Sequence, residues 1–124
     1  MTLEELYELI GGNFDQVQKI MRKERLIDKH IRKLADSELC NQLIAAGDQM
    51  DATGLYENAH ALKGVCANLG LDDLAAAASE ITEEFRPGND RRFSDDEVKA
   101  KLQDIADKFD STKAGIQQYA NANA

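Results

Sequence analysis

The sequence predicts an all-α protein, an antiparallel up-down-up-down four-helix bundle with a short accessory helix at its N-terminus. Strong helix formers such as Ala, Leu, Glu and Lys predominate, and Pro87 is the only proline. Four longer segments each carry one apolar stripe at helical spacing, and most connections between them are short. A chain of 124 residues fits one domain. We therefore expect residues 1–124 to form a single helical domain, with 1–12 as the accessory helix, 13–120 as the bundle and 121–124 as a frayed tail.

The first third of the chain contains clear helix boundaries. Thr2 and Glu5 have the spacing of a capping box, and Gly11-Gly12 end the accessory helix. Asn13 can cap the next helix. That helix carries an apolar stripe formed by Phe14, Val17, Ile20, Ile27, Ile31 and Leu34. Glu24 interrupts the stripe, and the pattern does not decide whether the helix bends or breaks there. A further helical segment follows Asp36-Ser37 and ends at Gly47-Asp48.

The remaining two thirds predict three longer helices. Residues 49–54 have the composition of a loop, in which Asp51 or Thr53 could cap a helix that ends at Leu69 and Gly70. A second helix covers 71–85, and the segment 86–93 forms a loop around Pro87-Gly88. Ser94 and Glu97 form another capping box for a final helix that reaches about Tyr119. The expected core stripes are Leu55, Ala59, Leu62, Cys66 and Leu69; Leu71, Leu74, Ala78, Ile81 and Phe85; and Val98, Leu102, Ile105, Phe109 and Ile116.

One side of the helix that ends at Leu69 carries residues suited to chemistry. Tyr56, His60, Lys63, Gly64 and Ala67 lie next to the apolar stripe, about 100° further round the helix axis. The imidazole is thus expected at the solvent-facing edge of the core stripe. A glycine within a helix costs about 1 kcal/mol relative to alanine, so its presence there indicates close approach by another helix or by a partner.

Three roles are open to such a histidine. A general base would need a nearby nucleophile, and no Ser or Thr shares this side of the helix. A metal site would need further ligands, and neither i+3 nor i+4 carries His, Asp or Glu, so we expect no metal. A group acceptor needs an accessible nitrogen, a cation for the phosphoryl oxygens and space for the donor. Lys63 and Gly64 meet those needs, but the spacing alone does not exclude an ordinary surface histidine.

The string Ala59-His60-Ala61-Leu62-Lys63-Gly64, followed by Asn68-Leu69-Gly70, resembles the signature of histidine-containing phosphotransfer (HPt) domains. The motif covers about a dozen residues, and the N-terminal half resembles the family only in its helical pattern. The resemblance implies a four-helix-bundle carrier in which His60 accepts the phosphoryl group. It also implies that Lys63 assists the phosphoryl group and that Gly64 lets a receiver domain approach.

From this resemblance we expect a phosphoprotein of two-component signal transduction. It would move a phosphoryl group between receiver-domain aspartates of a hybrid histidine kinase and a response regulator. Tyr56 and Ala67 would belong to the docking face. The carrier would be no enzyme, because it has no ATP site, and it would need no cofactor, because the receiver brings the magnesium. The alternative is a helical adaptor or inhibitor that binds a kinase or receiver domain without accepting phosphate.

Composition and charge argue against some classes of function and cellular location. A net charge of −8 argues against nucleic-acid binding. Residues 19–33 nevertheless carry seven basic side chains against two acidic ones, which fits a solvated helix face or a docking patch for an acidic partner. No run approaches the roughly 18 apolar residues of a membrane span, and no signal sequence is recognisable, so we expect a cytoplasmic protein. We also expect a monomer, although the sequence itself does not show whether the protein dimerises. Cys40 and Cys66 are expected to be buried, and His30 is expected to have a structural or surface role.

Overall fold

The computed structural model describes residues 1–124 and contains seven α-helices and no strand. The helices are α1 (Leu3–Ile10), α2 (Phe14–Met21), α3 (Glu24–Ala35), α4 (Leu39–Asp48), α5 (Ala52–Asn68), α6 (Asp72–Phe85) and α7 (Asp95–Ala122). The predicted all-α class is confirmed. No helix combines the length and the apolar character needed to cross a bilayer.

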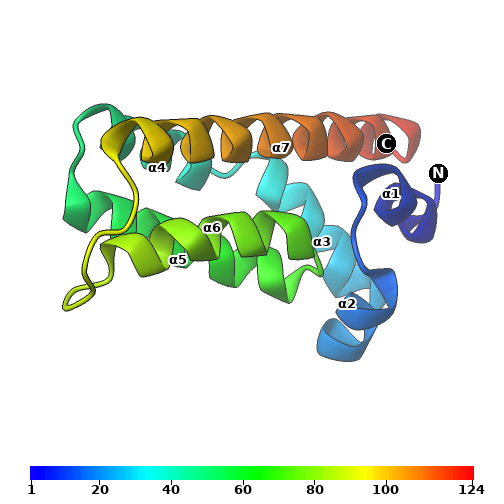
Figure 1. Cartoon of the computed structure of the whole chain (residues 1–124). Coiled ribbons are helices and arrows are strands. Elements are labelled where there is room, and N and C mark those ends of the chain that lie inside the picture. The colour runs from blue at the N-terminus through cyan, green and yellow to red at the C-terminus, as the bar shows by residue number, and fades with distance from the viewer.

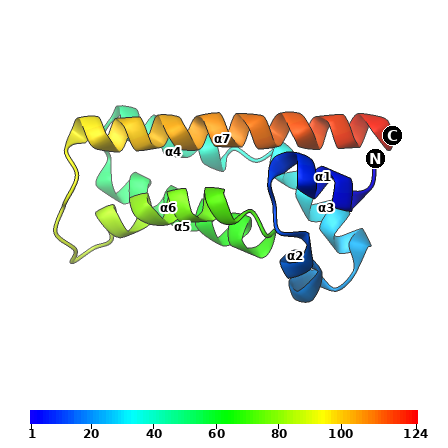
Figure 2. The same ribbon diagram turned by 45° about the vertical axis from the view of Figure 1, so that its right-hand side comes forward.

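Helices α4 to α7 form the bundle, in which α5, α6 and α7 each run antiparallel to the preceding helix (Figure 1). Helix α7, with 28 residues, extends along the whole molecule and contacts α1, α3, α4 and α6. Helices α1, α2 and α3 gather at one end, where the two termini also meet (Figure 2). The amide of Asn123 donates a hydrogen bond to the carbonyl oxygen of Met1 at 2.6 Å. The site helix α5 is packed between α4 and α6.

The apolar stripes of the three long helices form the core, as predicted. Every residue of the stripes in α5, α6 and α7 is buried. The predicted N-terminal caps are also present: Thr2, Asn13 and Ser94 each accept a hydrogen bond from a backbone N–H at the start of their helix. These two signals, periodicity and capping, therefore account for most of the bundle.

The segment before the bundle is more divided than its apolar stripe predicted. The chain breaks between α2 and α3 at Arg22, which adopts a left-handed conformation with φ of 64°. The break turns α2 away from the bundle, and Ile20, a member of the predicted stripe, is 46% exposed. Helix α3 stays attached to α7, because the Tyr119 hydroxyl donates a hydrogen bond to Asp28 at 2.6 Å. Two short helices, α2 and α3, thus stand where one bundle helix was expected.

Two predicted boundaries shift by a few residues. Helix α5 already begins at Ala52, because Asp51 acts as its N-cap and accepts a hydrogen bond from the N–H of Gly54 at 3.2 Å. The expected loop over 49–54 is therefore too long. At the other end of the chain, α7 continues through Ala122 and so includes the first two residues of the segment 121–124.

Helix α1 is firmly joined to the far end of α5. Tyr7 is buried, and its hydroxyl donates a hydrogen bond of 2.7 Å to the carbonyl oxygen of Leu69. The backbone N–H of Asn13 donates to the carbonyl oxygen of Gly70 at 2.8 Å. The turn between α5 and α6 is thus held by the segment that follows α1.

A buried carboxylate, Glu84, fixes the loop between α6 and α7. Its side chain is fully inaccessible and accepts hydrogen bonds from the backbone N–H groups of Arg92 at 3.0 Å and Phe93 at 2.8 Å. The guanidinium Nε of Arg91 donates to it at 3.2 Å. Burial opposes ionisation, but these donors outweigh it and hold the pKa of Glu84 below its usual range.

Replacing Glu84 with glutamine is expected to lower the free energy of unfolding at neutral pH by about 1–3 kcal/mol, the usual cost of disrupting hydrogen bonds to a buried charged group. Because the folded-state pKa is lowered, the carboxylate's contribution is present above the unfolded-state pKa and disappears as pH falls through the folded-state value. Urea unfolding from about pH 7 to about pH 3 checks this. The difference in free energy of unfolding between wild type and Glu84→Gln should shrink as the pH falls, and a difference that stays constant would contradict this prediction.

Candidate phosphotransfer site

The structure places the predicted site residues on one side of α5. His60 and Gly64 are exposed, and Tyr56, Lys63 and Ala67 are half-buried. The helix itself is anchored from the opposite side, where Leu62 and Cys66 are fully buried. The imidazole is therefore presented to solvent by a backbone that is held in the core.

His60 does not project freely. Its ring stacks on the ring of Tyr56, one turn earlier in α5, with 5.6 Å between the centroids and 13° between the planes. Such an offset parallel arrangement is favourable for two aromatic rings. Tyr56 in turn packs against the edge of the core. Tyr56 was expected to belong to the docking face, and the structure adds a direct contact between its ring and the imidazole.

Two charged residues at the end of α6 complete this group. Arg86 lies over the ring of Tyr56, with 5.4 Å from its Cζ to the centroid, and its Nη1 donates to the Tyr56 hydroxyl at 3.2 Å. Nη2 of the same guanidinium donates to Glu83 at 2.9 Å. This hydrogen bond from Arg86 holds the pKa of Glu83 below its usual range, and the positive charge of Lys63 contributes in the same direction. Lys63 and Arg86 thus supply two positive charges around one carboxylate.

Neither Arg86 nor Glu83 was predicted from the sequence as a site residue. Arg86 was assigned to the loop over 86–93, and nothing in the sequence placed that loop beside α5. The i, i+3 spacing of the two residues at the end of a helix indicates an ion pair. The contact with Tyr56 depends on how α5 and α6 pack, so it needed the structure.

Gly64 leaves an open surface next to the imidazole. A methyl group at this position would meet no other side chain and no neighbouring helix within 4 Å. Packing inside the protein therefore does not require glycine here. Because helical side chains lean towards the N-terminus, a larger side chain at position 64 would cover the surface beside His60.

Neither cysteine takes part in this site. Cys66 faces the core from the other side of α5, and burial raises the pKa of its thiol to about 12. Burial likewise raises the pKa of the Cys40 thiol to about 11. Both behave as small buried apolar residues, as predicted. The structure contains no group of three or more His, Cys, Asp or Glu side chains that could hold a metal ion.

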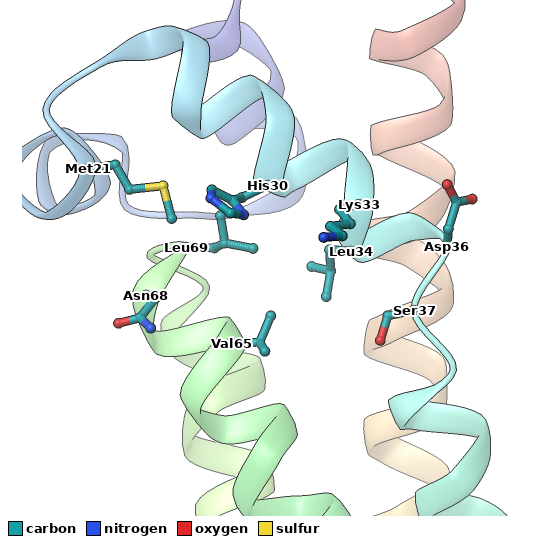
Figure 3. A pocket seen from close by; sticks show the side chains of 9 residues that line it. All are labelled: Met21, His30, Lys33, Leu34, Asp36, Ser37, Val65, Asn68 and Leu69. Atoms are coloured by element: carbon teal, nitrogen blue, oxygen red, sulfur yellow. The ribbon is translucent and has the colours of Figure 1, made fainter.

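The second histidine of the chain, His30, lies elsewhere. It is exposed on α3 and faces a pocket of about 610 Å³ between α3 and the C-terminal part of α5 (Figure 3). Lys33 lines the same pocket from α3, and Val65 and Asn68 line it from α5. None of the five predicted site residues belongs to this pocket. His30 has no aromatic stack like the one between His60 and Tyr56.

Comparison with known proteins gives one match. The family model described as the Hpt domain matches residues 27–115, which include most of α3, all of α4 to α6 and most of α7. Searches of curated proteins and of solved structures find no match. His60, Lys63 and Gly64 all lie inside the matched segment, and the matched segment covers well over half of the chain. The chain therefore belongs to the Hpt domain family of phosphotransfer proteins.

Proposed function

We propose that this protein carries a phosphoryl group on His60 in a phosphorelay. Membership of the Hpt family places the chain in phosphotransfer signalling. The more specific assignment rests on one observation: within the matched segment, an exposed imidazole lies beside an open glycine surface on a helix that is buried on its other side. Transfer between two proteins needs such an accessible nucleophile.

The proposed reaction is a reversible exchange between histidine and aspartate. A neutral imidazole nitrogen of His60 attacks the phosphorus of a receiver's aspartyl phosphate. The bond from phosphorus to the aspartyl oxygen breaks, the carboxylate leaves with the electron pair, and a phosphorus–nitrogen bond forms. The reverse reaction passes the group to the aspartate of another receiver. Lys63 would stabilise the phosphoryl oxygens as a point charge.

The partners in this proposal are receiver domains, one from a hybrid histidine kinase and one from a response regulator. The receiver would bring the magnesium ion, and this chain would supply the nucleophile, the charge of Lys63 and a docking face that includes Gly64 and Ala67. The carrier would therefore need no cofactor and no ATP site of its own.

Phosphoryl transfer from a receiver tests this function. The protein is incubated with a phosphorylated receiver domain and magnesium, and its mass is measured under non-acidic conditions that preserve phosphohistidine. The expected result is one added phosphoryl group, located by peptide mapping on the segment that contains His60 and not on the one that contains His30. Binding to several receivers without transfer from any would instead support the adaptor or inhibitor.

A further inference from the structure

We propose that Tyr56 is a positioning residue for His60 and that Arg86 and Glu83 hold it in place. This inference rests on the proposed function, because it concerns the nucleophile of that reaction. It replaces the docking role expected for Tyr56 with a role inside the carrier. It also assigns a role to Glu83 in α6 and to Arg86 directly after it, which both lie outside the site motif.

The geometry of the stack suits an attacking nitrogen. The Tyr56 ring covers one face of the imidazole, with only 13° between the two planes. The lone pair of an imidazole nitrogen lies in the ring plane and points outward from the ring edge. A stack on the face therefore restricts rotation of the side chain while it leaves the edges of the exposed ring open to a phosphoryl donor. Holding a reacting group in one orientation raises the rate of attack.

The stack is itself held from a second helix. The guanidinium of Arg86 contacts the Tyr56 ring and donates to its hydroxyl at 3.2 Å. The same guanidinium makes forked contacts with Glu83, from Nε to Oε2 at 3.1 Å and from Nη2 to Oε1 at 2.9 Å. Forked arginine–carboxylate pairs fix orientation better than single contacts. The side chain of Asn89 also donates to the Glu83 carbonyl oxygen at 2.9 Å, which ties the following loop to the end of α6.

The order of contacts runs from Glu83 through Arg86 and Tyr56 to His60. Each step joins two side chains that are in direct contact. The series of contacts crosses from the end of α6 to α5, and these two helices have the most extensive packing in the molecule. Because the core holds α5 and α6 together, the series of contacts from Glu83 to His60 does not depend on a flexible segment. A lone exposed histidine would have several side-chain orientations, and this arrangement selects one.

Positioning and docking predict different kinetics. A docking residue changes the receiver concentration that gives half-maximal transfer. A positioning residue changes the transfer rate at saturating receiver and leaves that concentration unaltered. The two roles also differ in the free protein, because only positioning requires the imidazole to be stacked before any partner binds.

The test compares Tyr56→Leu, Tyr56→Phe and Arg86→Gln with wild type. In the free protein, ring-current shifts of the imidazole carbon-bound protons report the stack, and His30, the only other histidine, is the internal reference. We expect Tyr56→Leu to remove the shift at His60 without moving the His30 signals. Its transfer rate at saturating receiver should fall roughly two- to tenfold, the population change that loss of an aromatic pair implies. Tyr56→Phe should keep the shift and most of the rate.

Arg86→Gln should reduce both the ring-current shift and the saturating rate, to a smaller extent than Tyr56→Leu. Lys113→Gln, a charge removal at an exposed position of α7, is the matched control and should change neither. Unmoved His60 signals in Tyr56→Leu, or a loss confined to the half-saturating receiver concentration, would overturn the proposal. If wild type accepted no phosphoryl group, the proposed function would fail, and the spectra of the free protein would still decide whether Tyr56 orients His60.

Discussion

Replacing His60 with glutamine is expected to abolish phosphoryl acceptance and to leave folding and receiver binding intact. Glutamine is polar and of similar size, but its amide nitrogen is not nucleophilic. The side chain is exposed, so the free energy of unfolding should stay within about 0.5 kcal/mol of wild type. Mass measurement after incubation with a phosphorylated receiver, a binding titration and a thermal melt check the three parts separately.

The chain offers a matched control for this substitution. His30 is also an exposed helical histidine, and His30→Gln should leave phosphoryl acceptance unchanged. If the protein is a phosphoryl carrier, relay output should disappear in His60→Gln while the receiver still binds. Full relay output from His60→Gln would contradict the carrier and favour the adaptor, which uses the docking face but not the imidazole.

Substitutions at Gly64 should change stability and transfer in opposite directions. Space around this position is open and glycine is a poor helix former, so Gly64→Ala should raise the free energy of unfolding by about 1 kcal/mol. Gly64→Gln should also stabilise the helix, yet its side chain would lean over the surface beside His60. Transfer from a receiver should then fall roughly 100-fold, the loss that misplacement of the reacting groups by about 1 Å can cause.

Gly115 in α7 provides the comparison for the stability part. A methyl group there would lie 2.5 Å from Cγ2 of Ile10, so Gly115→Ala should stabilise the protein less than Gly64→Ala does. Urea unfolding compares the free energies of unfolding of Gly64→Ala and Gly115→Ala. Transfer reactions quenched at successive times give the rate of phosphoryl transfer to Gly64→Gln. Wild-type transfer by Gly64→Gln would show that no partner uses the open surface beside the imidazole.

Local signals in the sequence predicted the bundle well. Helix α5 has an aspartate cap and ends next to Gly70, whose φ of 72° suits glycine. Its apolar stripe, from Leu55 to Leu69, is buried throughout because a period of 3.6 residues reports directly on which side of a helix faces the core. The same periodicity placed His60 beside the stripe, at its exposed edge. The position of the imidazole at the exposed edge of α5 was therefore predictable without knowing how the helices pack.

Features that depend on contacts between distant segments were not predictable. The break between α2 and α3 falls at Arg22, a residue type that gives no sign of a left-handed backbone. Glu84 is buried because the following loop folds back and donates its N–H groups to the carboxylate, and that loop has no periodic pattern. Arg86 reaches Tyr56 only because α6 packs on α5. Charged residue types are mostly solvated, so residue type alone does not indicate the contacts of Glu84 and Arg86.

The hydrogen bond from the Tyr7 hydroxyl to the carbonyl oxygen of Leu69 bears on how much of the chain folds and unfolds as one cooperative unit. The last carbonyl groups of any helix lack partners within that helix, and here α1 supplies one for α5. Residues 1–26 lie outside the segment that the family model matches, yet Tyr7 and Asn13 close the end of α5, the helix that contains His60. Amide hydrogen exchange in the last turns of α5 should therefore be governed by the attachment of α1. We therefore expect the smallest autonomous folding unit of this protein to be larger than the matched segment 27–115.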